Sequence, residues 1–301
     1  MVDDRLLAPD PCALTRRHPH WYTRCSQRVL IGVKALAIGS LAVLAAHAAE
    51  PRPGPEAFVR EVDLRLELPP QAQREYAGRL EQALARAGIA DPPAQYFVLV
   101  DRSARVQAGF VYWRSPEATW RFIGASPVST GRPGAYEHFL TPLGVFAHSL
   151  QNMDFRAEGT RNALGILGYG RRGMRVYDFG WVPAQRTWGA GGAGLMRLQM
   201  HATDPQRLEP LLGQWRSEGC IRIPATLNAF IDRHGLLDAD YEAAARSGKA
   251  PWVLRADREP TPWPGRWLVI VDSQREARPA WSPPPPQKRR PAAVPATGRL
   301  T

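Results

Sequence analysis

Cysteine is scarce in this sequence, with three among 301 residues. Cys12 and Cys25 lie before an apolar run near the N-terminus, and Cys220 is the one cysteine in the rest of the chain. A single thiol cannot form an internal disulfide, which excludes a disulfide-stabilised scaffold. Such a cysteine is either a small buried apolar side chain or a candidate nucleophile, and the count leaves both open.

The sequence also lacks the patterns of two common classes of hydrolase. Its candidate ligands His138, His148, His201 and His234 form no short-spaced pair of the kind that predicts a zinc site. No Gly-x-Ser-x-Gly motif is present, which excludes the serine nucleophile elbow. We therefore expect no metal ion, and the mechanism that the resemblance given below implies requires no organic cofactor.

Basic residues are concentrated at the two ends of the chain. Of the formal net charge of +11, residues 1–49 contribute +3 and residues 278–301 contribute +5, which leaves +3 for the long middle part. A mildly basic middle part does not predict a nucleic-acid-binding surface. The basic ends instead fit an export leader and a solvated tail.

No apolar run comfortably reaches the roughly 20 residues that a membrane-spanning helix needs. Residues 35–46 form an uncharged run of twelve, preceded by basic side chains and followed by the small residues Ala46 and Ala48. This is the pattern of a secretory signal, so we expect residues 1–49 to direct export to the periplasm. An uncleaved signal anchor stays open, because extending the run back to Val29 lengthens it but includes Lys34.

The rest of the chain is expected to form one catalytic domain with flanking segments. Residues 50–93 are expected to hold a Pro-rich linker up to residue 70 and an amphipathic helix over 71–87, where apolar side chains recur at helical spacing. Residues 94–275 form the expected domain, and residues 276–301 a Pro-rich basic tail that we expect to be disordered.

Short strands dominate the expected domain. We predict a strand pair within 95–114 joined by a turn at 101–103, further strands at 120–128, 144–149, 174–179, 195–201, 252–256 and 267–271, and helices at 225–233 and 238–247. Many short strands and few helices predict a mainly β fold, a sandwich or a barrel-like core.

The stretch "MHATDPQRLEPLLGQWRSEGCIRIP", residues 200–224, holds the candidate site. His201 ends a predicted strand, and the following segment is long enough to return Cys220 beside it. An imidazole could take the thiol proton or form an imidazolium paired with a thiolate. Gly219 removes a side chain where a substrate would approach, and Arg222 would point to the same side as Cys220.

These residues resemble the active-site signature of the bacterial L,D-transpeptidases. The run from Ser217 to Arg222, "SEGCIR", follows His201 as in that family. The resemblance covers residues 95–233 and includes "YFVLVDRSARVQAGFVYW", "PVSTGRPG" at 127–134 and "TPLGVF" at 141–146. It implies the mainly β catalytic fold of that family, with Cys220 as nucleophile, His201 as base and Arg222 assisting substrate binding or site geometry.

The resemblance assigns supporting roles and also has two departures. Ser217 would support the loop, and backbone N–H groups at Gly219 and Cys220 would form an oxyanion hole. A backbone carbonyl would orient the histidine. Glu218 stands where histidine is common in the family, which puts local charge in question. Ala202 stands where glycine is common, which puts the backbone next to the base in question.

The implied function is a cysteine acyltransferase that acts on peptidoglycan stem tetrapeptides and amine acceptors through a Cys220 thioester. A hydrolase on the same scaffold stays open, because water competes with amines for one acyl-enzyme. A non-catalytic wall-binding protein is the alternative from another class. We expect a monomer, and a tail that weakly contacts anionic wall polymer or membrane surface. Unchanged localisation after deletion of residues 279–301 would contradict that role of the tail.

Residues 150–194 carry several aromatic side chains and the glycine-rich run "GAGGAG" at 189–194. By analogy with the family they could form a lid with glycine hinges over the cleft. A disordered surface insertion is the alternative.

Overall fold

The computed structural model describes residues 50–284; the expected export signal and the last residues of the tail lie outside that part. The helices are α1 (Pro55–Glu61), α2 (Pro70–Arg86), η1 (Glu209–Leu211), α3 (Ala225–His234) and α4 (Ala239–Arg246). The strands are β1 (Gln95–Asp101), β2 (Ala108–Arg114), β3 (Trp120–Pro127), β4 (Gly144–Ala147), β5 (Phe155–Arg156), β6 (Arg175–Gln185), β7 (Ala193–Ala202), β8 (Ile221–Ile223) and β9 (Trp267–Val271). Among residues 50–284, no helix is long and apolar enough to cross a bilayer.

The strands form two mixed sheets. The first sheet has the order β3-β2-β1-β9-β4, in which only the β1–β9 pair is parallel. The second has the order β5-β6-β7-β8, in which only the β7–β8 pair is parallel. The expectation of a β-rich fold with few helices is therefore confirmed.

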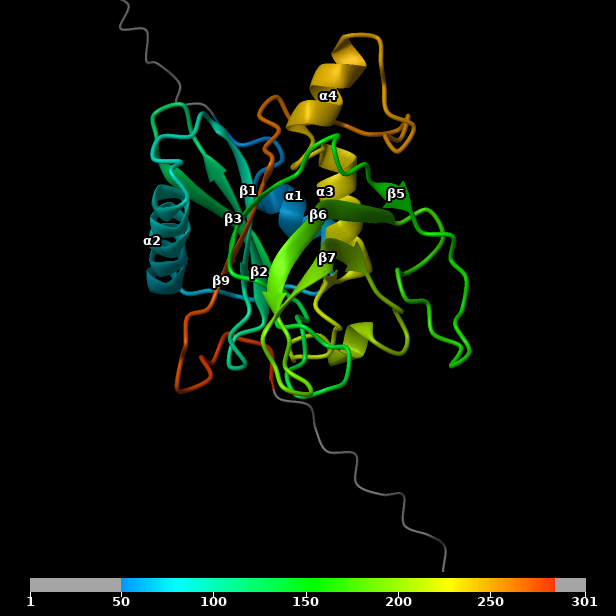
Figure 1. Cartoon of the computed structure of the whole chain (residues 1–301). Coiled ribbons are helices and arrows are strands. Elements are labelled where there is room, and N and C mark those ends of the chain that lie inside the picture. Colours follow the sequence, from blue (N-terminus) through cyan, green and yellow to red (C-terminus); the bar gives the residue numbers. More distant parts are fainter. Residues whose placement is uncertain (1–49, 285–301) are drawn as a thin grey trace, which may run out of the picture. The chain divides into compact units, whose positions relative to one another are not determined.

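The first sheet is covered on both faces, which makes three layers (Figure 1). Side chains such as Phe97 and Leu99 of β1 pack with Tyr76 and Leu80 of α2. The alternate β1 side chains, among them Val98, pack toward the second sheet and α3. Because both faces are buried, β1 is a continuous apolar run and lacks the apolar–polar alternation of a half-exposed strand.

Most predicted elements match the structure, including the helix over 71–87, the two helices after residue 224 and the strands that became β1–β4, β6, β7 and β9. The strand expected at 252–256 is wrong. There the Leu254 N–H donates to the Pro251 carbonyl at 3.0 Å and closes a turn. Val253 is buried, but Trp252 is 65% exposed. The segment therefore packs through one apolar side chain in a turn and pairs with no neighbouring strand.

The segment expected to be a linker, residues 50–70, is part of the folded body. It contains α1, and both Phe58 and Val62 are buried in the core between the sheets. A Cβ on Gly124 of β3 would lie 2.2 Å from the Phe58 ring, so this glycine makes room for α1 on the sheet. The prolines here lie in the turns around α1, and the expected linker is wrong for these residues.

The first residues of the expected tail are also packed. Trp281 makes edge contacts with Tyr76 and Phe110, with ring centroids 5.7 and 6.1 Å apart. The Ser282 hydroxyl lies 3.0 Å from the Arg105 carbonyl, to which it can donate a hydrogen bond. The expected disorder is therefore wrong for residues 276–284, because an indole ring covers apolar surface beside α2.

Candidate active site

The parallel pairing of β7 with β8 brings the predicted nucleophile and base to one place. His201, the next-to-last residue of β7, pairs with Arg222 of β8, and Cys220 immediately precedes β8. Side chains alternate along a strand, so His201, Arg222 and Cys220 emerge on the same face of the second sheet. The long connection after His201 therefore returns the chain beside it, as the sequence predicts.

The Cys220 side chain is half-buried. Its Sγ lies 3.8 Å from the carbonyl oxygen of Arg197, to which the S–H group points. Burial raises the pKa of Cys220 to about 11, and the charge of Glu218 adds to this rise. The Gln199 N–H and the Arg222 guanidinium act in the opposite direction without cancelling it. The thiol is therefore protonated at neutral pH.

His201 is held as a neutral base. Its Nδ1 lies 2.6 Å from the Ala202 carbonyl oxygen. A carbonyl can only accept, so Nδ1 carries the proton and Nε2 is left as the acceptor of the neutral ring. Burial lowers the pKa of His201 to about 4; the Arg222 charge lowers it further, while the bond to Ala202 opposes the shift.

Of the two protonation states that the sequence leaves open, the neutral thiol with the neutral imidazole is the resting one. An imidazolium–thiolate pair needs a histidine pKa above that of the thiol, and burial moves both pKa values in the other direction. The arrangement can take the thiol proton onto Nε2 during attack on a carbonyl carbon.

Two segments that carry the family resemblance hold the loop before Cys220. Within the "TPLGVF" segment, Thr141 donates from Oγ1 to the Gly219 carbonyl at 2.7 Å. Within the "PVSTGRPG" segment, the Gly131 N–H donates to the same Thr141 oxygen at 2.8 Å. A Cβ on Gly131 would lie 1.9 Å from the Phe139 carbonyl oxygen, so only glycine fits this crossing.

Ser217 braces the loop from within, as the resemblance implies. Its buried hydroxyl donates to the Cys220 carbonyl and accepts the Gly219 N–H at 3.2 Å. The Gly219 N–H already donates to Ser217, so only one of the two expected oxyanion donors is free. The Cys220 N–H is the donor of this pair that remains for an oxyanion.

Gly219 is required by both conformation and space. Its φ of +137° lies in a region that favours glycine. A Cβ here would lie 2.7 Å from Cε and 2.8 Å from Sδ of Met196, a β7 residue on the opposite face from His201. The absence of a side chain at Gly219 therefore allows the loop before Cys220 to pack closely against β7.

Arg222 acts mainly on the geometry and charge of the site. Its Nη1 donates to the Arg216 carbonyl at 2.9 Å, which closes the loop around Cys220. Its Nε is buried and has no hydrogen-bond partner among the described residues. The guanidinium favours the thiolate of Cys220 and the neutral form of His201.

Both departures from the family pattern have a physical account. Ala202 lies in regular strand conformation and is buried, so its backbone does not need glycine. Its methyl group instead occupies space that Gly170 leaves open, since a Cβ on Gly170 would lie 2.8 Å from it. Glu218 is exposed, and its charge raises the pKa of Cys220.

Sequence reasoning missed a hydrogen-bonded network beside the two reactive residues. The Tyr169 ring lies edge-on against His201 with 4.6 Å between centroids, and its hydroxyl donates to Gln199 Oε1 at 3.1 Å. Buried Asp178 accepts from Gln199 Nε2 at 2.8 Å and from Arg197 Nε at 2.7 Å. The alternation of residues 195, 197, 199 and 201 along β7 was the available signal for this shared face.

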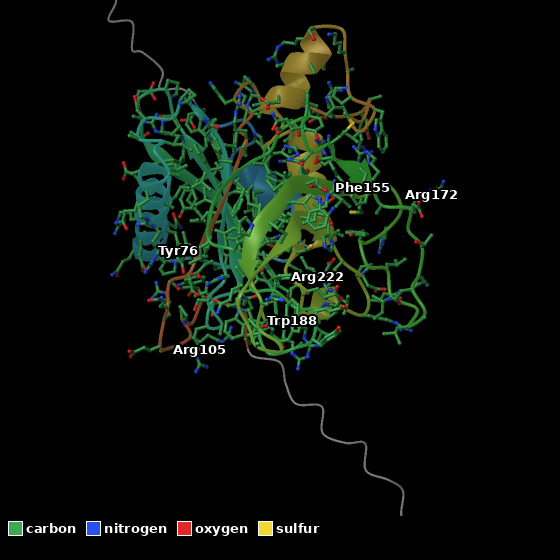
Figure 2. All side chains as sticks on the ribbon, in the orientation of Figure 1. Tyr76, Arg105, Phe155, Arg172, Trp188 and Arg222 are labelled. Carbon is green, nitrogen blue, oxygen red and sulfur yellow. The ribbon has the colours of Figure 1, made fainter. Side chains whose placement is uncertain are left out.

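The region 150–194 is not a disordered surface insertion. It contains β5 and the long strand β6, which pairs with β7. Tyr169 covers His201, and Trp188 packs edge-on against Phe139 with 4.8 Å between centroids. Trp188 lies in the turn between β6 and β7 (Figure 2). The run "GAGGAG" forms the end of that turn and the start of β7.

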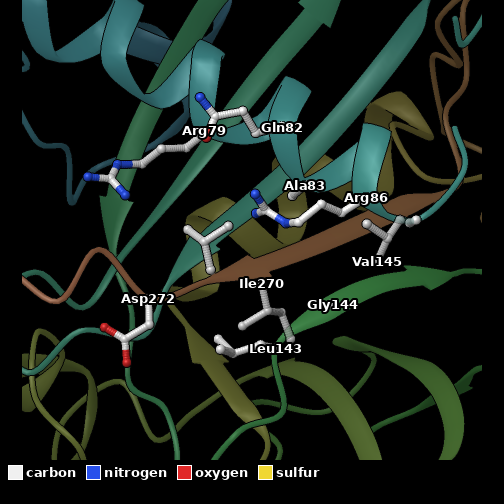
Figure 3. Close-up of a pocket in the computed structure, with 11 residues that line it drawn as sticks. Arg79, Gln82, Ala83, Arg86, Leu143, Gly144, Val145, Ile270 and Asp272 are labelled. Carbon is white, nitrogen blue, oxygen red and sulfur yellow. The ribbon is translucent and has the colours of Figure 1, made fainter. Parts of the chain in front are cut away.

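A cavity of about 430 Å³ lies elsewhere on the molecule, between α2, β4 and β9 (Figure 3). Arg79, Arg86 and Asp272 line it, and none of the predicted catalytic residues does. Across residues 50–284, no group of three His, Cys, Asp or Glu side chains is arranged to hold a metal ion. No protein-family profile matches the chain, and no curated protein sequence matches it.

Proposed function

We propose that the chain is a cysteine acyltransferase of the L,D-transpeptidase type that acts on peptidoglycan stem tetrapeptides. The observation that carries the proposal is the geometry around His201. Its Nδ1 proton is committed to the Ala202 carbonyl, so Nε2 is left as the acceptor of a ring that lies on the same face of the sheet as Cys220. The proposal includes export of the chain, because the proposed substrate lies outside the cytoplasm. The apolar run at 35–46 would be the export signal.

The first half-reaction forms a thioester. Cys220 Sγ attacks the carbonyl between the L-centre of the diamino acid and the terminal D-residue, while His201 Nε2 takes the thiol proton. The carbon–nitrogen bond breaks, and the D-residue leaves as an amine that receives the proton from His201. The Cys220 N–H would stabilise the tetrahedral oxyanion, because the Gly219 N–H already donates to Ser217.

The second half-reaction releases the acyl group from sulfur. An amine acceptor attacks the thioester, His201 accepts its proton, and the thiol reforms when that proton returns to Sγ. The acceptor amine comes from a second stem, a lipoprotein lysine or a free D-amino acid. No step needs a metal ion or an organic cofactor.

The test is incubation of residues 50–301 with purified tetrapeptide muropeptides, with and without an amine acceptor, followed by mass analysis. Products joined between two diamino acids support transfer, and shortened stems alone would support the hydrolase. Full activity of Cys220→Ala would contradict the mechanism. A carbapenem is expected to add one adduct on Cys220, and the absence of that adduct would count against an accessible nucleophile.

A further inference from the structure

Arg197 lies on the face of β7 that carries the reactive residues. It precedes His201 by four positions, so the two side chains emerge on the same side of the strand. The carbonyl oxygen of Arg197 lies 3.8 Å from the Sγ of Cys220. Arg197 therefore contacts the proposed nucleophile through its backbone, and its side chain lies close to the site.

The guanidinium of Arg197 is fixed at one end and open at the other. Its Nε donates to Asp178 Oδ2 at 2.7 Å, and the side chain is 46% exposed. Asp178 is itself held, because it accepts the Gln199 amide at 2.8 Å and the Gly180 N–H at 2.9 Å. Neither Nη group of Arg197 has an acceptor within the described part of the chain.

The Tyr169 hydroxyl donates to Gln199 at 3.1 Å, and Gln199 donates to the same Asp178 oxygen that accepts from Arg197 Nε. Burial raises the pKa of Tyr169, and a thiolate at Cys220 and the carboxylates of Asp178 and Glu218 raise it further. The charge of Arg197 lowers it. Hydrogen bonds thus connect Tyr169, which contacts His201, to the guanidinium of Arg197.

The surface beside Arg197 is unusually apolar for an exposed strand face. Trp181 is the cross-strand partner of Arg197 and is 66% exposed. Leu195, two residues before Arg197 on the same face, is 65% exposed. The guanidinium therefore projects next to apolar surface, where an ion pair is less weakened by water.

Arg222 is less suited to contact a substrate anion. Its Nη1 is held by the Arg216 carbonyl, and its Nε is buried. Arg197 presents free Nη groups to solvent, and a planar guanidinium can bind both oxygens of a carboxylate. A tetrapeptide donor has such a carboxylate one residue beyond the scissile carbonyl, on the departing D-residue.

We propose that Arg197 is a specificity-determining residue that binds the terminal carboxylate of the departing D-residue, with Trp181 and Leu195 beside it. This inference rests on the proposed acyl transfer from stem tetrapeptides. It makes the site selective for a donor whose scissile bond precedes the last residue, because only that residue brings a carboxylate to Arg197.

The experiment compares two tetrapeptide donors that differ only at the C-terminus, one a free acid and the other a carboxamide. The wild-type chain is expected to favour the free acid in kcat/KM by roughly 10- to 100-fold, the range of a charge-assisted pair. Arg197→Ala is expected to bring this ratio close to one, and Arg197→Lys to leave an intermediate ratio. Arg233→Ala is the matched control, since Arg233, at the end of α3, is also half-exposed and is ion-paired with Glu259.

The ratio separates substrate binding from a structural role. If Arg197 served only to neutralise Asp178, Arg197→Ala would slow both donors equally and the ratio would persist, which would overturn the inference. A wild-type chain that uses both donors equally would overturn it as well and leave the proposed function standing. A wild-type chain inactive on both donors would overturn the proposed function together with this inference.

Discussion

The ring of Tyr169 lies against the imidazole of His201, with 4.6 Å between centroids and 66° between the ring planes. Phe155 of β5 packs against Tyr169 in turn, with centroids 5.5 Å apart. The aromatic contact covers His201, and burial is the main cause that lowers the pKa of His201 to about 4. Tyr169 therefore helps to keep the proposed base neutral.

Replacing Tyr169 by alanine should expose His201 to water and raise its pKa toward the ordinary value. On the acid side, kcat/KM falls as His201 becomes protonated. The midpoint of this fall should lie about 1 pH unit or more higher in Tyr169→Ala than in the wild-type chain. Tyr169→Phe keeps the ring and loses the bond to Gln199, so its acid limb should stay in place. A pH profile of all three chains between pH 3 and 8 checks this, and an unmoved limb in Tyr169→Ala would show that other groups shield the base.

Gly170→Ala should destabilise the fold because of Ala202. A Cβ at Gly170 would lie 2.8 Å from the Ala202 Cβ, in a backbone conformation with φ of +85°. We expect a loss of about 2–4 kcal/mol in the free energy of unfolding, from overpacking plus backbone strain. Gly173→Ala is the control, since Gly173 has a φ of +83° and nothing within 4 Å, so it should show the strain alone.

A second substitution tests the steric part directly. Ala202→Gly placed in the Gly170→Ala background should recover the overpacking part of the loss and leave the strain. Denaturant unfolding of the single and double variants measures both parts. If the double variant were no more stable than Gly170→Ala, the contact between positions 170 and 202 would not be the cause.

A buried charge cluster joins β4, β6 and α4 away from the candidate site. His148 is fully buried, its Nδ1 lies 2.8 Å from the Leu237 carbonyl and its Nε2 lies 2.8 Å from Asp154. Both partners accept, so the ring carries two protons and is a cation. Arg175, with Nε 2.6 Å from Asp154 and Nη1 2.7 Å from Asp238, completes the cluster.

This cluster predicts a pH dependence of stability with a definite sign. Burial alone would lower the pKa of His148, but the Asp154 carboxylate overcomes it and raises the pKa above 6.5. The folded chain therefore binds a proton more tightly than the unfolded one. The stabilisation is fully present below pH 6.5 and is lost as the pH rises through the folded pKa. Unfolding free energies measured from pH 6 to 10 should fall in the wild-type chain, and the fall should be smaller in His148→Gln.

That His201 and Cys220 lie close together could be predicted because both residues belong to one short stretch of the sequence. Strand alternation also carried the signal for the face that His201 shares with Arg197 and Gln199, although no prediction was drawn from it. The pairing of β7 with β8 could not be predicted from the sequence, because β8 has only three residues and is defined by its partner strand. Tyr169 was missed as a contact of His201 for the same reason, because a loop residue is placed by tertiary packing.

The errors at the ends of the domain have one physical cause. Proline-rich composition predicted a linker at residues 50–70 and a disordered tail from residue 276 onward. Single large apolar side chains override that prediction: Phe58 fills the space above Gly124, and Trp281 covers Tyr76. Composition averages over a window, whereas one buried ring is enough to fix a segment on a sheet or helix.

Glu218 should set the reactivity of Cys220 in a measurable way. Its carboxylate adds to the burial that raises the pKa of Cys220 to about 11. Glu218→Gln removes this charge from an exposed position, so the pKa should fall slightly, and alkylation by iodoacetamide at pH 8 should be roughly two- to threefold faster. Cys220 is the one cysteine after residue 49, so mass analysis of residues 50–301 follows it directly.

Glu117→Gln, which removes an exposed carboxylate from the turn between β2 and β3, is the control and should leave the rate unchanged. Equal rates for Glu218→Gln and the wild-type chain would mean that solvent screens the Glu218 charge from the thiol.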